Sequence, residues 1–123
     1  MKQDILCLNE TWLNDSTPRL SITGYEQVSR RDRPQQVVTE FNHGGIAVFR
    51  RAHSILITHV EDSTIAERSW HTLHTDLGPI LVGLWYRPPS SPNNYVLSFR
   101  VELERLMSTI VGYIIFGDLN IWN

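Results

Sequence analysis

The feature that most constrains the fold of this chain is its carboxyl-terminal stretch, residues 113–120. Residues 113–116 are four apolar or aromatic residues in a row, and they predict a short strand buried on both faces. Gly117 permits a turn that a larger residue would resist. Asp118 and Asn120 follow two positions apart, so an extended backbone sends both side chains to the same side. The pattern predicts a carboxylate and a carboxamide at the carboxyl end of a buried strand, where ligands bind in open α/β sheets.

The length and composition describe one globular domain or part of one. The chain has 123 residues, of which 41% are hydrophobic and 20% charged, which suits a packed core rather than disorder. The single cysteine, Cys7, excludes an internal disulfide and a thiolate metal cluster. A net charge of −2 creates no global attraction for nucleic acid, so any such contact would come from the arginines of residues 30–33 or 50–51.

No signal peptide or transmembrane segment is expected. The apolar run near the amino end, residues 5–8, is too short for either. We therefore expect an intracellular protein without a membrane partner, and the nucleus is among the compartments that this allows.

Several further segments have the pattern of strands. Continuous apolar runs predict buried strands at residues 5–8, 46–49 and 80–85, and alternation predicts half-buried strands at residues 54–60 and 67–75. We expect the strands in the middle of the chain to be linked by hairpins and antiparallel. Residues 29–44 are rich in charges and predict a long surface loop.

A helix of roughly four to five turns is predicted before the last strand. Ser91 suits its N-cap, Pro92 its first position and Gly112 its end. The residues of its apolar face would be Tyr95, Phe99, Leu103, Leu106 and Ile110. The residues mostly on the opposite side would be Glu102, Glu104 and Arg105.

Three of the predicted strands end in polar clusters that contain Glu10, Tyr86 with Arg87, and Asp118 with Asn120. If these ends lie together, the set suits one hard cation and a phosphate. Glu10 would hold Mg²⁺, which takes few protein carboxylates and neutralises phosphate charge. Asp118 would orient and deprotonate a water. Asn120 and Tyr86 would donate hydrogen bonds to the phosphorus oxygens as charge builds.

Each of these residues also has a simpler interpretation. Glu10 would be a solvated loop carboxylate, and Tyr86 would cap the core with its hydroxyl in water. An isolated Gly-Asp-Leu-Asn is more often a turn than a site. Arg33 and Arg87 are weak candidates for contact with a nucleic-acid backbone, and surface charge explains them equally well.

Other conspicuous side chains are interpreted as structural. Trp12 and Trp85 are expected to pack rather than to stack on bases. His71 and His74 are three positions apart in a predicted strand, so they face opposite ways and are poor joint metal ligands.

Four blocks of the chain, taken together, resemble the endonuclease/exonuclease/phosphatase family. Their order and approximate spacing are most similar to the apurinic-type endonuclease domain of non-LTR (LINE-like) retrotransposons. The blocks are residues 9–13 (NETWL), 43–48 (HGGIAV), 86–89 (YRPP) and 117–120 (GDLN). The resemblance implies an α/β (α+β) fold, a four-layer sandwich of two mixed, mostly antiparallel sheets with flanking helices. Residues 1–123 would cover about its first half, as a partial domain.

The same resemblance implies roles for individual residues. Glu10 would be the ligand of Mg²⁺ (or Mn²⁺), and Tyr86 would contact the phosphate. Asp118 would activate the attacking water, and Asn120 would steady the transition state.

The chain also departs from the family pattern. It begins after the strand that carries an active-site Asn in family members, and it stops before a later Ser-Asp-His-type block. None of the five histidines matches that block. We therefore expect a fragment of a longer gene product or a decayed copy that exposes apolar surface, because the inner face of the first sheet would lie open. The missing half of the domain would be a partner, and so would a reverse transcriptase in the full-length protein.

The leading hypothesis is a Mg²⁺-dependent phosphodiesterase that nicks DNA for a retroelement. The first alternative is a catalytically inactive remnant that at most binds nucleic acid weakly. The second is a family member that hydrolyses phosphoinositide or nucleotide phosphomonoesters, against which the YRPP and ETWL sequences argue.

Overall fold

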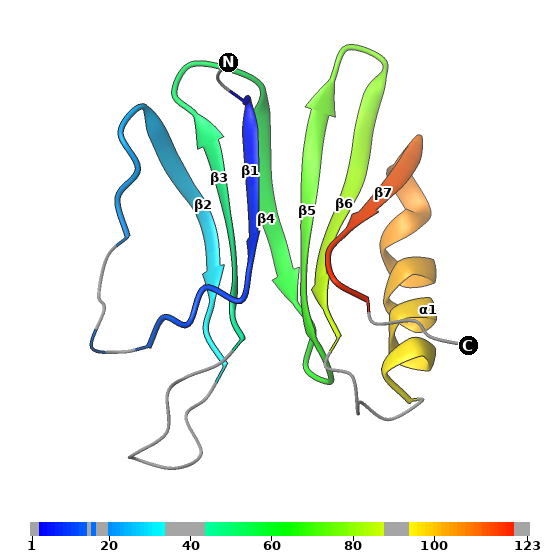
Figure 1. The fold of residues 1–123 in the computed structure, drawn as a ribbon. Coiled ribbons are helices and arrows are strands. Elements are labelled where there is room, and N and C mark those ends of the chain that lie inside the picture. Colours follow the sequence, from blue (N-terminus) through cyan, green and yellow to red (C-terminus); the bar gives the residue numbers. More distant parts are fainter. Residues whose placement is uncertain (1–2, 15, 17–19, 34–43, 88–93, 120–123) are drawn as a thin grey trace.

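The computed structural model of the protein describes residues 3–14, 16, 20–33, 44–87 and 94–119. These residues form two β-sheets and one α-helix, which is followed by a short 3₁₀ turn (Figure 1). The elements are β1 (Ile5–Asn9), β2 (Tyr25–Arg31), β3 (Ile46–Arg51), β4 (Leu56–Asp62), β5 (Glu67–Thr75), β6 (Gly78–Tyr86), α1 (Asn94–Leu106), η1 (Met107–Thr109) and β7 (Gly112–Phe116).

The first sheet has the strand order β1-β3-β2 and is antiparallel throughout. The second has the order β4-β5-β6-β7, in which only the β6–β7 pair is parallel. The parallel pair is joined through α1, as a crossover between parallel strands requires. This architecture is an α+β partial sandwich of mixed and antiparallel sheets with a flanking helix, so the predicted fold class is confirmed.

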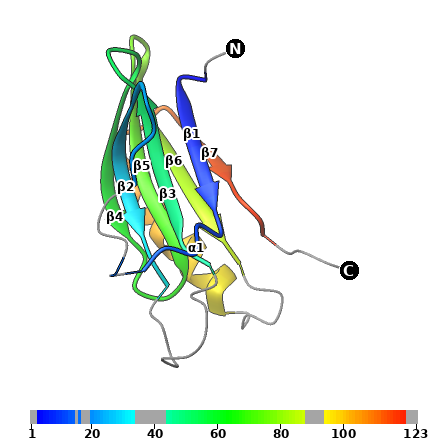
Figure 2. The same ribbon diagram turned by 60° about the vertical axis from the view of Figure 1, so that its left-hand side comes forward.

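The two sheets pack face to face around the hydrophobic core (Figure 2). Ile46 and Val48 of the first sheet meet Val82 and Leu84 of the second, and all four are at most 4% exposed. We expected the inner face of the first sheet to lie open. That expectation is wrong for most of this face, because β4 to β7 supply a covering sheet from within the chain.

Helix α1 covers the other face of the second sheet. The Phe99 ring stacks on those of Trp70 and Trp85, at centroid distances of 5.9 and 5.2 Å. Glu102 is only 8% exposed, so its predicted place on the solvent side is wrong. It is buried because it is the acceptor for polar groups of β5, among them the Arg68 guanidinium.

The helix also ends earlier than predicted. α1 stops at Leu106, η1 continues to Thr109, and β7 already includes Gly112. The predicted N-cap and first position, Ser91 and Pro92, lie outside the described residues. None of the described helices is long and apolar enough to cross a bilayer.

The polar strand β2 was not predicted, and its last residues fall in the expected 29–44 loop. Its arginines have partners: Arg30 pairs with Asp32 at 2.8 Å, and Arg31 donates a hydrogen bond to the carbonyl of Arg68 in β5. Pairing with β3 therefore overrides a composition typical of loops. Residues 34–43 of that loop lie outside the described residues.

The predicted hairpin between the strands at residues 46–49 and 54–60 is also wrong. β3 pairs with β1 and β2, whereas β4 belongs to the second sheet and pairs with β5. The hairpins β4–β5 and β5–β6 are antiparallel as expected.

The strands β1 and β7 are less buried than their sequences predict. Every residue of β1 is partly exposed, and Tyr113, Ile114 and Phe116 of β7 are 41–49% exposed. Both strands lie at the edge of a sheet, where one side has no neighbouring strand. Between them lies an apolar groove of about 310 Å³, whose lining residues are Ile5, Cys7, Leu73, Val82, Ile114 and Phe116. The expected exposure of apolar surface is thus confirmed at this edge.

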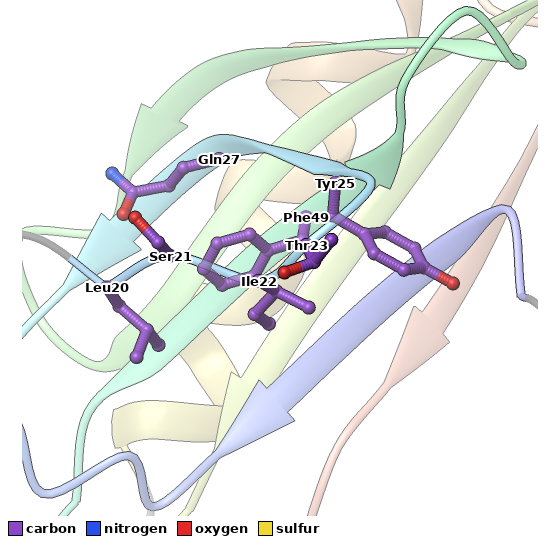
Figure 3. Close-up of a pocket in the computed structure, with 7 residues that line it drawn as sticks. All are labelled: Leu20, Ser21, Ile22, Thr23, Tyr25, Gln27 and Phe49. Atoms are coloured by element: carbon purple, nitrogen blue, oxygen red, sulfur yellow. The ribbon is translucent and has the colours of Figure 1, made fainter.

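The outer face of the first sheet is covered by the segment before β2. This segment shields Phe49 of β3, which is 1% exposed, and leaves a cavity of about 670 Å³ (Figure 3). The lining residues are Leu20, Ser21, Ile22, Thr23, Tyr25, Gln27 and Phe49. All of these described lining residues are uncharged.

Candidate functional site

The candidate site lies where β1, β6 and β7 end. β1 and β7 run in the same direction, and their carboxyl ends point to the same end of the molecule (Figure 2). The ladder between β6 and β7 pairs Leu84 with Phe116. It is extended by a hydrogen bond of 2.8 Å from the Arg87 amide to the Asp118 carbonyl. Asp118, which is exposed, therefore lies beside the end of β6.

The turn into Asp118 requires a glycine. Gly117 has φ +135°, and a Cβ atom there would lie 1.8 Å from the carbonyl oxygen of Trp85. No side chain can be accommodated at that distance without moving the strand. The close approach keeps Asp118 next to β6, in agreement with the role predicted for this glycine.

Glu10 and Tyr86 meet although 76 residues separate them. The Tyr86 hydroxyl donates a hydrogen bond of 3.4 Å to the Glu10 carboxylate. Burial and the negative charge of Glu10 raise the pKa of Tyr86, and the positive charge of Arg33 opposes this rise. The phenol is therefore held in its protonated form, in which it can donate a hydrogen bond.

The loop that carries Glu10 has an unusual backbone. Glu10 and Trp12 have φ angles of 50° and 58°, in the left-handed region that non-glycine residues rarely adopt. The amides of Thr11 and Trp12 hold this conformation by donating to the carbonyls of Gly45 and Gly44 at 3.3 and 2.9 Å. Backbone strain of this kind is concentrated at functional sites.

The two tryptophans differ in burial. Trp85 is 4% exposed and stacks on Phe99, so its predicted packing role is confirmed. Trp12 is 48% exposed, so its assignment to the packed core is wrong. The left-handed backbone at Trp12 directs the chain away from the end of β1.

Arg33 and Glu67 complete the candidate site. Arg33 Nε and Nη2 donate to the two carboxylate oxygens of Glu67, at 2.5 and 3.1 Å. The Arg33 guanidinium carbon lies 5.3 Å from the centroid of the Tyr86 ring. We call Glu10, Arg33, Glu67, Tyr86 and Asp118 the strand-end cluster. Sequence reasoning missed Glu67, because an acidic residue at the start of a half-buried strand is a common surface feature.

Asn120, the fourth residue on which the predicted site depends, lies outside the described residues. Arg87 is partly buried at the end of β6, and its backbone amide binds the chain of Asp118. Its contact with nucleic acid, and that of Arg33, stay predictions.

The residues present fit one hard cation. Within the described ranges, no group of three or more His, Cys, Asp and Glu side chains is arranged to hold a metal. Glu10 and Asp118, which follow β1 and β7, are exposed residues whose carboxylates offer only oxygen as a donor. Mg²⁺ is bound by one or two carboxylates and keeps several waters, whereas zinc takes nitrogen and sulfur ligands. The side-chain oxygens of Asn9 and Thr11, next to Glu10, are buried without a hydrogen-bond partner among the described residues.

His71 and His74 take no part in this cluster. His71 is fully buried, and its Nε2 lies 2.6 Å from the Ser29 hydroxyl. Burial, with a smaller effect of His59, lowers the pKa of His71 to about 4. His74 is exposed and bonds Thr58. The prediction that His71 and His74 are structural and face opposite ways is confirmed.

A comparison of the chain with the models of known protein families and with curated proteins finds no match. The fold and the cluster therefore define only a class. The chain is an α+β partial sandwich in which the Glu10 carboxylate and the Tyr86 hydroxyl meet where β1 and β6 end.

Proposed function

We propose that the protein is a Mg²⁺-dependent phosphodiesterase that nicks DNA, acting with a reverse transcriptase in a retroelement. The observation that carries this proposal is the contact between the Tyr86 hydroxyl and the Glu10 carboxylate, with Asp118 bound beside the end of the same strand. Three of the four sequence blocks that resemble the endonuclease/exonuclease/phosphatase family supply these three residues.

Each residue has a chemical role in this proposal. Glu10 would hold the Mg²⁺ or Mn²⁺ ion, which would neutralise charge on the phosphate oxygens. With Glu10 on the ion, the single proton of the Tyr86 hydroxyl would pass from its hydrogen bond with Glu10 to one with a non-bridging phosphate oxygen, and Asn120 would donate to the phosphate as well. The exposed Asp118 carboxylate accepts a proton from the water whose oxygen attacks the phosphorus. The bond from phosphorus to the leaving oxygen then breaks, the leaving alkoxide takes up a proton from solvent water, and the nick is left with a phosphate on one end and a hydroxyl on the other.

The proposal is tested with the purified chain, Mg²⁺ and supercoiled plasmid DNA. We expect open circles to form with the wild type and at least about 100-fold more slowly with Asp118→Asn or Glu10→Gln. Asp76→Asn is the matched control, because Asp76 is an exposed aspartate in the turn between β5 and β6, at the opposite end of the strands. Nicking that survives in both site variants would contradict the proposal.

A second candidate is a remnant that binds nucleic acid weakly and has no activity. The absence of a three-residue metal group from the described residues favours it. Binding of the plasmid without nicking, at any concentration of Mg²⁺ or Mn²⁺, would support this candidate. The third candidate is a phosphomonoesterase, and two small substrates test it. Hydrolysis of p-nitrophenyl phosphate but not of bis(p-nitrophenyl) phosphate would support this candidate.

A further inference from the structure

The guanidinium of Arg33 has its position fixed from three sides. Glu67 binds it side-on through two hydrogen bonds, at 2.5 and 3.1 Å. The centroid of the Tyr86 ring lies 5.3 Å from the guanidinium carbon of Arg33. On the third side is Gly44, where a Cβ atom would lie 2.7 Å from both Cζ and Nε of Arg33. A bidentate arginine–carboxylate pair adds geometric specificity that a single contact does not give.

The pair Arg33–Glu67 is joined to the rest of the cluster through Tyr86. Glu67 is the cross-strand neighbour of Tyr86 in the β5–β6 ladder. Arg33 rests on one part of the Tyr86 side chain, and Glu10 accepts the hydrogen bond of its hydroxyl. The four side chains thus form a row in the order Glu67, Arg33, Tyr86 and Glu10, with a negative group at each end.

The charges of this row argue against Arg33 as a phosphate contact. Glu67 already neutralises Arg33, and its hydrogen bonds are the main cause that raises the pKa of Arg33. Glu10, Arg33 and Glu67 together carry one negative charge in excess. A phosphate would gain little from a cation whose charge is compensated in this way.

We propose that Arg33, fixed by Glu67, is a positioning residue that holds Tyr86 against Glu10. Its kinetic consequence rests on the proposed function of the strand-end cluster. Gly44 is part of the same arrangement, since any side chain at this position would displace the Arg33 guanidinium. The glycine pair of the HGGIAV block therefore provides the room in which the site is assembled: Gly44 for Arg33, and Gly45 for Thr11, whose Oγ1 would be 2.5 Å from an added Cβ.

The first measurement does not need activity. We expect the order parameter of the Tyr86 ring, measured by ¹³C relaxation and assigned with Tyr86→Phe, to fall in Arg33→Met, Arg33→Lys and Glu67→Gln. Arg50→Met is the matched control, because Arg50 pairs with Glu26 at the other end of β3. An unchanged Tyr86 ring in all three variants would overturn the inference, whether or not the protein cleaves DNA.

The second measurement separates positioning from phosphate contact. For a positioning residue, Arg33→Met and Arg33→Lys both lower kcat about tenfold, while KM and the Kd for DNA stay within about twofold. Lysine does not rescue, because it cannot make the bidentate pair with Glu67. A phosphate contact gives the opposite result. Arg33→Met then weakens DNA binding and reduces the slope of the logarithm of the binding constant against the logarithm of the salt concentration by about one, and Arg33→Lys restores the affinity and the slope. That outcome would overturn the inference and leave the proposed function intact.

A wild type that does not nick DNA would contradict the proposed function but not the inference. In that case the order parameter of Tyr86 still decides whether Arg33 and Glu67 hold the ring.

Discussion

The two faces of the second sheet carry the same motif and use it differently. Glu67 and Arg68 are consecutive in β5, and opposite them in β6 stand Tyr86 and Trp85. On the face toward the first sheet, Glu67 binds Arg33, which lies over Tyr86. On the face toward α1, Arg68 lies 4.0 Å from the ring centroid of Trp85 and binds Glu102.

The pair under the helix is almost fully enclosed, and every polar side-chain atom of the pair except Arg68 Nε has a hydrogen-bond partner. Glu102 accepts hydrogen bonds from Arg68, Trp70 and Ser63, at 3.0, 2.8 and 2.7 Å. Arg68 also donates to the Tyr95 carbonyl at 2.8 Å. Burial lowers the pKa of Arg68 even though Glu102 acts in the opposite direction. Such a network holds the helix in place but leaves no group for a ligand.

The pair toward the first sheet is partly open. The side chains of Arg33 and Glu67 are 29% and 13% exposed, and the hydrogen bonds to Glu67 raise the pKa of Arg33. Because Glu10 and Asp118 are exposed, a ligand can reach the cluster. The comparison indicates that burial, and not the identity of the paired residues, separates the pair under the helix from the pair toward the first sheet.

The largest effect is expected from the enclosed pair. Glu102→Ala leaves the buried charge of Arg68 without its partner, which should cost about 3–5 kcal/mol of unfolding free energy. Urea denaturation followed by circular dichroism measures this cost. Glu104→Ala is the matched control on the same helix: its pair with Arg100 is exposed, so we expect a change of about 0.5 kcal/mol or less. Equal effects of the two variants would break the comparison.

Acid should destabilise the face toward the first sheet through His71. Its pKa is lowered to about 4 when folded, from about 6.5 when unfolded. The unfolded chain therefore binds the proton more tightly. The contribution of neutral His71 to the unfolding free energy is fully present above pH 6.5. As the pH falls toward 4, about 2–3 kcal/mol of this contribution is lost.

Urea denaturation at a series of pH values measures this loss. His71→Gln should flatten the dependence between pH 6.5 and 4, whereas the exposed His74→Gln should leave it unchanged. A wild type whose stability is constant over this range would show that His71 is not buried as a neutral group. The ionisable groups that face it, His59 and Asp62, are kept in all of these variants.

The smallest effect on stability is expected from the open pair. Arg33→Met or Glu67→Gln should cost about 1 kcal/mol or less, because solvent screens a partly exposed ion pair. The same urea titration measures it beside Glu102→Ala. A cost as large as that of Glu102→Ala would mean that the open pair is structural, and it would remove the distinction between the two faces.

Local pattern was sufficient where one residue and its neighbours decide the conformation. The alternation of residues 67–75 placed Trp70 and His71 on opposite faces of β5, as observed. The continuous apolar run in β6 marked a strand buried on both faces, and Gly117 marked the turn that follows β7. These features could be predicted because period and backbone freedom are properties of the sequence itself.

The candidate site could be predicted only in part. Glu10, Tyr86 and Asp118 were identified because each follows an apolar run, and the end of a strand is visible in a sequence. Glu67 was not identified, because it is distinguished only by its partner Arg33, which is 34 residues away in the sequence. The exposure of Trp12 was missed for a similar reason, since it depends on a left-handed backbone that the carbonyls of Gly44 and Gly45 hold in place.

By itself, the sequence determined every strand except β2, the helix apart from its end, and the polar residues that end the strands, since these follow from the order of side chains along the chain. Tertiary structure alone decided which polar residues are buried and which strands lie at an edge. It buried Glu102 against Arg68, made a strand of the polar residues in β2, and left β7 half-exposed. The physical reason is that the stability of a charge or an apolar side chain depends on what surrounds it, and those surroundings come from segments far away in the sequence.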